Sequence, residues 1–183
     1  MARTIEGIGI NDAEFKVVHT VDGLKTCIPS YATWKSLLRR IYTLKTRGPG
    51  IKLCDEWLTF SGFHTWFMEN NVEGWGLDSR LLNPHDEDIG PTNCIFAPHH
   101  LTCFINDFNN SKRLPGVNFK AGRFQARVKL LDTKDSIFLG NFDSEEEAHA
   151  AWKVAKIGLV HKMKPELDAL HSDLFKCMLQ RYS

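Results

Sequence analysis

The side chains best suited to chemistry in this chain alternate along residues 123–129. Polar side chains stand there at every second position: Arg123, Gln125, Arg127 and Lys129. The three residues between them are apolar, and because strand side chains point alternately to two faces, we expect one polar and one apolar face. Guanidinium, ammonium and amide groups bind phosphates and base edges. The segment therefore predicts a strand whose polar face binds DNA, the alternative being a face whose charges are only solvated.

The element expected behind this strand is a helix with a clear start. Ser144 is a favourable N-cap, and Glu147 three residues later completes a capping box. Gly158 predicts the end of the helix. Small or aromatic side chains recur at helical spacing, at Ala148, Ala151, Trp152 and Ala155. Alanines let a helix lie close to a sheet, so the polar strand face would stay uncovered.

Residues 114–155 resemble a known DNA-binding domain. The motifs are Gly116-Val117, Arg-Phe-Gln-Ala-Arg at 123–127, Leu-Gly-Asn-Phe at 139–142 and the Glu-Glu-Ala…Ala-Trp helix. They are similar to the domain of plant ethylene-response (Apetala-type) factors, a version of which follows homing-endonuclease modules in phage proteins. The resemblance implies a three-stranded antiparallel sheet that lies in the DNA major groove, with one helix behind it.

A second group of candidate residues lies between residues 71 and 108. Asp78 ends one short predicted strand, Asn93 lies at the second, and a helix is predicted from His99 to about Phe108. Strand, loop, strand and helix follow one another in this order in a ββα-metal (His-Me) finger. Such a finger uses one divalent cation to stabilise charge on the scissile phosphate and a histidine to deprotonate water.

The N-terminal half strengthens this second resemblance. Gly-Ile-Gly-Ile-Asn-Asp near residue 10 and the aromatic motifs of residues 31–42 and 54–66 are similar to phage HNH proteins of the homing-endonuclease kind. With the C-terminal module included, the resemblance covers nearly the whole chain. It implies a nuclease that acts on DNA with Mg²⁺ or Mn²⁺.

The finger departs from the family at two positions. The resemblance places Asp78 at the first metal position and Asn93 at the brace, but Ser79 stands where the general-base histidine belongs. Thr102 likewise stands where the helix ligand belongs. An unperturbed serine hydroxyl cannot act as a base near neutral pH. We therefore expect a degenerate site, and whether the chain is an enzyme stays open.

Two histidines could replace the missing groups. His99 lies three residues before Thr102 and hence on the same helical face, and His85 lies in the loop after Asp78. The alternative is that both are ordinary polar residues of a helix start and a solvated loop. A structural zinc site at Cys27, Cys54 and Cys94 is not expected, because no CxxC pair supports it.

The rest of the chain predicts mainly helices and an apolar core. A helix capped by Ser30 and a second helix over residues 55–70, rich in aromatic residues, are expected to build the core, with His64 as a packed histidine. A last helix is expected at residues 165–181. The polar segment 109–113 predicts a boundary between an HNH-like region, 1–110, and a DNA-binding domain with a C-terminal helix, 111–183.

The overall composition restricts where DNA could bind and where the protein resides. The 23 Lys and Arg residues nearly balance 22 Asp and Glu residues, so any nucleic-acid surface must be local. No apolar run could span a membrane, and no signal peptide is recognised. Five cysteines at irregular spacing are expected to be reduced and mostly buried. We expect a cytoplasmic protein, in the host cytoplasm if a phage encodes it.

The sequence as a whole predicts an α+β protein that binds double-stranded DNA. A helical, aromatic-rich N-terminal region with a His-Me finger-like motif should precede a three-stranded antiparallel sheet packed on a helix, and a C-terminal helix. The first alternative is an active metal-dependent DNA-nicking enzyme that uses Asp78 and a displaced histidine. The second is a protein-interaction module, such as an inhibitor of a host factor, on a nuclease-derived scaffold.

Overall fold

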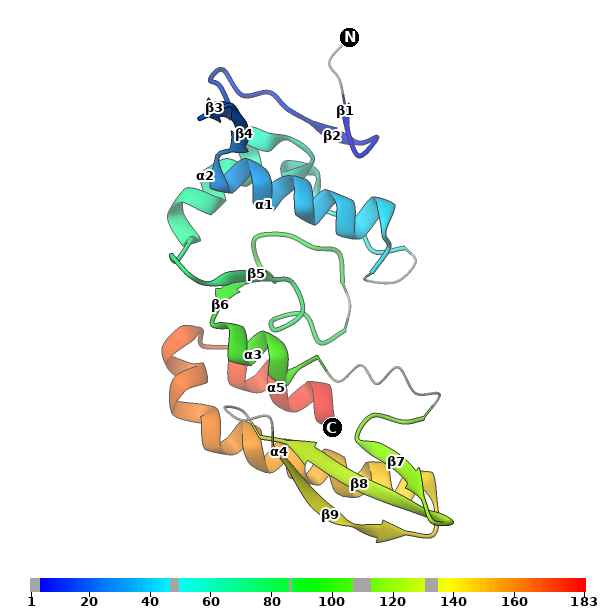
Figure 1. The fold of residues 1–183 in the computed structure, drawn as a ribbon. Coiled ribbons are helices and arrows are strands. Elements are labelled where there is room, and N and C mark those ends of the chain that lie inside the picture. The colour runs from blue at the N-terminus through cyan, green and yellow to red at the C-terminus, as the bar shows by residue number, and fades with distance from the viewer. Residues whose placement is uncertain (1–3, 47–49, 86, 107–112, 131–134) are drawn as a thin grey trace. The chain divides into compact units, whose positions relative to one another are not determined.

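The computed structural model describes residues 4–46, 50–85, 87–106, 113–130 and 135–183 (Figure 1). Helices hold 43% of the described residues and strands 23%, with the strands in several small sheets. The α+β class is therefore confirmed. The chain divides into two compact units, Met1–Phe96 and Ala97–Ser183, each of which is described by itself.

The described part of the first unit contains two hairpins, four helical segments and a short pair of strands. In chain order they are β1 (Thr4–Ile5), β2 (Gly9–Ile10), β3 (Val18–Val21), β4 (Leu24–Cys27), α1 (Pro29–Leu38), the π-helix η1 (Arg39–Thr43), the 3₁₀ helix η2 (Asp55–Leu58), α2 (Phe60–Asn70), β5 (Gly76–Asp78) and β6 (Ile95–Ala97). Strands pair as β1-β2, β3-β4 and β5-β6.

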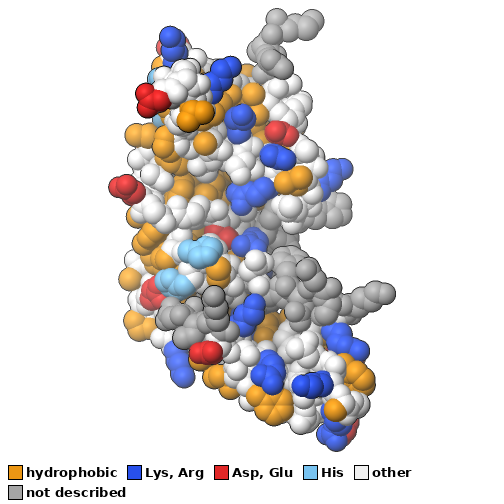
Figure 2. Space-filling view, in the orientation of Figure 1, with side chains coloured by type: hydrophobic (Ala, Val, Ile, Leu, Met, Phe, Trp, Pro, Cys, Tyr) orange, Lys and Arg blue, Asp and Glu red, His pale blue; other side chains and the backbone are white. Residues whose placement is uncertain are grey.

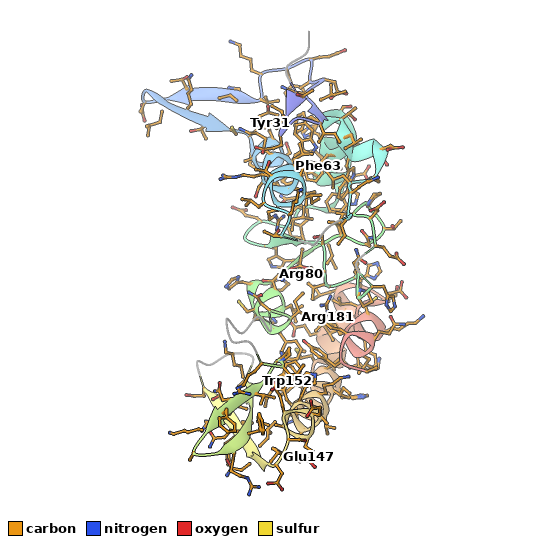
Figure 3. The ribbon with its side chains drawn as sticks, turned by 90° about the vertical axis from the view of Figure 1, so that its right-hand side faces the viewer. Tyr31, Phe63, Arg80, Glu147, Trp152 and Arg181 are labelled. Atoms are coloured by element: carbon orange, nitrogen blue, oxygen red, sulfur yellow. The ribbon has the colours of Figure 1, made fainter. Side chains whose placement is uncertain are left out.

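Aromatic side chains form the core of this unit, as predicted (Figure 3). Trp34 of α1 and Trp57 of η2 are fully buried, and the Trp34 Nε1 donates a hydrogen bond to the Trp57 carbonyl at 2.8 Å. His64 is half-buried against Phe60 and lies 2.9 Å from the Ser30 hydroxyl. The prediction of a packed histidine is confirmed.

Two helix predictions in this unit were wrong in detail. Ser30 is not the N-cap of α1: the helix begins at Pro29, whose lack of an N–H suits the first turn, and the hydroxyl of Ser30 faces His64 instead. The expected helix over residues 55–70 is two helices, η2 and α2, because Thr59 between them is extended at φ −98°, ψ 146°.

Over its described residues, the second unit has three helices and a three-stranded sheet, on which α4 packs. Its elements are α3 (His99–Phe104), β7 (Val117–Lys120), β8 (Arg123–Lys129), β9 (Ser136–Phe142), α4 (Glu145–Leu170) and α5 (Leu174–Tyr182). The sheet is antiparallel with order β7-β8-β9, and β8 has the bounds expected from its alternating pattern.

Helix α4 is longer than its sequence signals predicted. Gly158 does not end it, and Pro165 lies inside it rather than at the start of the last helix. The expected helix at 165–181 is therefore the end of α4 followed by α5. Buried Val160, Met163 and Leu167 extend the apolar stripe along α4, and this packing outweighs the cost of Gly and Pro within a helix.

Some predictions concern residues outside the described ranges. The polar boundary segment 109–113 lies almost entirely outside them. Along the sequence, the division between the two compact units falls between Phe96 and Ala97. Helix α3 ends at Phe104 rather than near Phe108, and residues 107–108 are not described. Within the described ranges, no helix combines the length and apolar character needed to cross a membrane.

Candidate nucleic-acid interface

Helix α4 covers one face of the β7–β8–β9 sheet (Figure 1). Its first turn carries the predicted capping box: the Ser144 hydroxyl accepts from the Glu147 N–H at 3.1 Å, and the Glu147 carboxylate accepts from the Ser144 N–H at 3.3 Å. Ala148 packs against Val117 and Ala126 in a small apolar cluster. The predicted close approach of an alanine-bearing helix face to the sheet is confirmed.

The strand register defines the residues on the opposite sheet face. Directly paired residues of antiparallel strands share a face, and Asn118 pairs with Gln125, which in turn pairs with Asn141. Lys120 pairs with Arg123 in the same way. This surface, called the polar sheet face below, consists of Asn118, Lys120, Arg123, Gln125, Arg127, Lys129, Ser136, Phe138 and Asn141.

Amide side chains cross the middle of the polar sheet face. Asn118, Gln125 and Asn141 come from three neighbouring strands, and the Gln125 Nε2 donates to the Asn141 Oδ1 at 3.1 Å. Each amide carries both donors and an acceptor. The row therefore presents the two kinds of group that a base edge in the major groove can recognise.

Cationic side chains lie on both sides of the amide row. Arg123 is 51% exposed and pairs at 3.1 Å with Asp143, which is 84% exposed, and so exposed a pair contributes little to stability. On the other side the Arg127 guanidinium lies 5.2 Å from the ring centroid of Phe138. Both arginines are exposed and thus accessible to an anion.

The dimensions of the sheet match a DNA groove. Neighbouring strands lie about 4.8 Å apart, so the outer two of three strands are roughly 10 Å apart, and the major groove of B-DNA is about 12 Å wide. Figure 2 shows blue Lys and Arg side chains interspersed with apolar and neutral ones where β7, β8 and β9 lie. The spacing of the outer strand axes is thus of the same order as the width of the groove.

Several residues of this face escaped the sequence-based prediction. Asn118 and Lys120 alternate with apolar residues in Val-Asn-Phe-Lys, a signal too short to use alone. Phe138 and Asn141 lie three apart in β9, and a register shift opposite Ala126 and Arg127 still brings both to the polar sheet face. A β-bulge of this kind breaks the period of two on which sequence patterns depend.

Asp78, the candidate metal ligand, is engaged in local contacts. It is 5% exposed, and its Oδ1 accepts from the backbone N–H groups of Arg80 at 2.7 Å and Leu81 at 3.0 Å. Its Oδ2 accepts from the Arg80 Nη2 at 2.9 Å. Both carboxylate oxygens therefore already have protein partners.

The other candidate residues of the first unit differ in their burial and hydrogen bonds. Ser79, which the resemblance places at the general-base position, is 5% exposed. The Asn93 side chain accepts from the Gly90 N–H at 2.9 Å and donates to the Asp88 carbonyl at 2.7 Å, so it braces the preceding loop. His85 is exposed. These contacts of Asn93 lie within its own loop, and its role in a finger stays a prediction.

The candidates on α3 interact with each other. The Thr102 hydroxyl donates to the His99 carbonyl at 2.8 Å, and the His99 Nε2 lies 3.2 Å from the Cys103 Sγ. The adjacent His100 pairs instead with Glu166 of α4 at 2.7 Å. His99 and Thr102 lie in one turn of helix as predicted, with Cys103 as an additional neighbour.

A metal-ligand cluster is not found within the described ranges. They contain no group of three or more His, Cys, Asp or Glu side chains placed to hold an ion. None of the five cysteines is in a disulfide, but the expectation that most are buried was wrong, since only Cys94 is fully buried. Burial raises the pKa of the Cys54 thiol, which disfavours the thiolate that zinc binds.

Comparisons of this chain with protein-family models, curated proteins and solved structures find no significant match.

Proposed function

We propose that this protein binds double-stranded DNA through the polar sheet face. The observation that carries the proposal is the cross-strand arrangement: a row of amides lies between exposed cations on a sheet face that α4 leaves uncovered. The near-zero net charge of the whole chain, +1, is compatible with this function because the cations are gathered locally.

The two kinds of side chain have different roles in the proposed complex. Arg123 and Lys129 lie toward opposite ends of β8 and contact backbone phosphates, which supplies affinity that depends on salt. Gln125 and Asn141 face base edges, where an amide can pair with adenine through two hydrogen bonds. The exposed ion pair between Arg123 and Asp143 opens at little cost when a phosphate replaces the carboxylate.

Efficient DNA cleavage is not part of the proposed function. Both oxygens of Asp78 are already hydrogen-bonded, and a serine at position 79 cannot supply the general base. This supports a protein that kept DNA binding on a nuclease-related chain. The active nuclease and the protein-interaction module are the alternatives that the binding and cleavage experiments described below can favour instead.

The decisive experiment replaces two cations of the polar sheet face. We expect Arg123→Ala with Arg127→Ala to weaken duplex binding in gel shifts across a salt series without altering the circular dichroism. Each lost phosphate contact should reduce the slope of log K against log salt by about one unit, and each lost guanine contact should cost about 1–3 kcal/mol at one base position.

The matched control removes two exposed lysines from the helices of the same unit. Lys162→Ala with Lys176→Ala removes the same charge from α4 and α5 and should leave the salt slope nearly unchanged. Equal duplex affinity of the arginine double variant and the wild type, both folded, would refute the sheet-face proposal. Absence of duplex binding by the wild type would favour the protein-interaction module.

A further inference from the structure

The positive charge of the first unit is concentrated in one stretch of its sequence. Residues 23–54 hold seven of the 23 Lys and Arg residues of the chain and none of its 22 Asp and Glu residues. This stretch therefore has a formal charge of +7, whereas the rest of the chain, with 16 cations and 22 acidic residues, has −6. The net charge of +1 conceals this separation, which would attract a polyanion to the stretch.

The helical segment formed by α1 and η1 lies in the middle of this stretch. Its buried side chains belong to the aromatic core, and they are Tyr31, Trp34, Leu37, Leu38 and Ile41. Outside this buried side, Arg39 is exposed and Lys35 is partly exposed, with its ammonium 5.7 Å from the Tyr31 ring centroid. Residues four apart are neighbours on a helix, about 6 Å apart along its axis.

Hydrogen bonds hold a third cation at the end of this helical segment. The Leu44 N–H donates to the Arg39 carbonyl at 2.8 Å, and the Thr46 N–H donates to the Arg40 carbonyl at 2.9 Å. Lys45 lies between these two donors and is exposed. We call Lys35, Arg39 and Lys45 the basic patch. Figure 2 shows several blue Lys and Arg side chains where α1 and the residues after it lie.

The charges of the basic patch are largely uncompensated. None of the ion pairs formed among the described residues includes Lys35, Arg39 or Lys45. One carboxylate comes close to the segment, that of Glu6, and it accepts a hydrogen bond from the Thr43 hydroxyl of η1. Three cations thus accompany one acidic group, and the surplus positive charge favours an anionic partner.

The burial of α1 favours a nucleic acid over a membrane as this partner. A basic helix that binds a membrane inserts its apolar face among the lipids. The apolar face of α1 is not available for insertion, because Trp34 and Leu38 are fully buried in the core. The exposed residues of α1 are small or short, Pro29, Ala32 and Ser36. Such a surface can approach phosphates but offers no large apolar side chain to lipid.

We propose that the basic patch is a second contact for double-stranded DNA, made to backbone phosphates rather than to bases. Phosphates of one strand follow each other about every 3.4 Å along the duplex axis, so Lys35 and Arg39 can both reach one strand. Residues 23–54 contain no Asn or Gln, the amides that pair with adenine. The choice of DNA rests on the proposed function, to which the patch adds affinity that does not depend on base sequence.

The test removes the helical pair of cations from the full-length chain. Lys35→Gln with Arg39→Gln keeps good helix formers and should lower the slope of log K against log salt by about two units. The loss should be equal for two duplexes of unrelated sequence. The matched control, Lys162→Gln with Lys176→Gln, removes the same charge from exposed positions of α4 and α5 and should leave the slope nearly unchanged.

Chemical labelling of the wild type tests the same contact without a substitution. Duplex DNA should protect Lys35 and Lys45 from an amine-reactive reagent, measured by mass spectrometry, and leave Lys162 and Lys176 as reactive as in the free protein. Unprotected Lys35 and Lys45, or a folded double variant with the wild-type salt slope, overturns the DNA contact. Protection of these two lysines by vesicles of anionic lipid but not by duplex would mean that the patch binds a membrane and that the proposal is wrong.

The basic patch and the polar sheet face can fail separately. A reduced salt slope in the Lys35 and Arg39 double variant, beside unchanged binding by the Arg123 and Arg127 double variant, would keep the basic patch and refute the proposed function. The reverse pattern would keep the proposed function and refute the basic patch. Absence of duplex binding by the wild type would refute both.

Discussion

Gly116 and Gly122 have nearly the same backbone conformation but different surroundings. Their φ angles are +78° and +77°, in the left-handed region that favours glycine. A Cβ on Gly116 would lie 2.1 Å from two ring atoms of Trp152, whereas a Cβ on Gly122 would meet nothing within 4 Å. Gly116 is thus the residue at which the indole of α4 approaches the backbone before β7.

This difference predicts the effect of adding one methyl group at each position. Gly122→Ala should cost only the backbone strain, about 1–2 kcal/mol, while Gly116→Ala adds overpacking against Trp152 of about 1–3 kcal/mol more. Urea unfolding of both variants measures the difference directly. Equal destabilisation of the two would show that Trp152 does not contact Gly116.

Lys156 shows how a charge can be accommodated in the core of the second unit. Its ammonium lies 3.8 Å from the ring centroid of Phe104 and 5.2 Å from that of Tyr182, and it donates a hydrogen bond to the Phe104 carbonyl. Cation–π attraction and the hydrogen bond offset part of the desolvation cost. This lysine links α4 to α3 and α5.

At the scale of the element, α4 is continuous through a proline. Pro165 has no N–H to donate to the carbonyl four residues earlier, and its ring disfavours the helix there. The helix persists because Met163 and Leu167, on either side, are buried. Packing therefore outweighs a local signal that in sequence is typical of a helix start.

Replacement of this proline tests the continuity of α4. Pro165→Ala should stabilise the protein by about 1–3 kcal/mol, because it restores a backbone hydrogen bond within the helix. Pro29→Ala is the control, since Pro29 lies in the first turn of α1, where proline is favourable, and it should give no stabilisation. Thermal unfolding followed by circular dichroism measures both, and a destabilised Pro165→Ala protein would indicate that a helix starts at that position.

At the scale of the whole molecule, the distribution of functional groups predicts binding without efficient catalysis. We expect no efficient metal-dependent nicking of supercoiled plasmid by the wild type with Mg²⁺ or Mn²⁺, because position 79 holds a serine rather than a histidine. General-base catalysis is typically worth about 10²–10⁴-fold. Gel electrophoresis over a time course measures the nicked fraction.

The variants for this assay separate the alternatives. Robust cleavage that is lost in Asp78→Asn would support the nuclease alternative, and loss in His85→Ala or His99→Ala would identify the compensating base. Robust cleavage that survives all three replacements would mean that another site performs the chemistry.

Short windows of sequence determined the local elements of this protein. The alternation of residues 123–129 corresponds to β8, and Ser144 with Glu147 forms the predicted capping box. The aromatic stripe around Phe63 is core. These features follow from side-chain periods and cap contacts that span only a few residues, so they can be identified without knowledge of the fold.

Contacts between distant residues were decided only by the tertiary structure. Cross-strand register placed Asn118 and Asn141 beside Gln125. Packing of the second unit buried Lys156 beside Phe104. Each of these contacts depends on how separate elements pair and pack. Packing energies also decided where α4 ends, because they exceed local helix preferences.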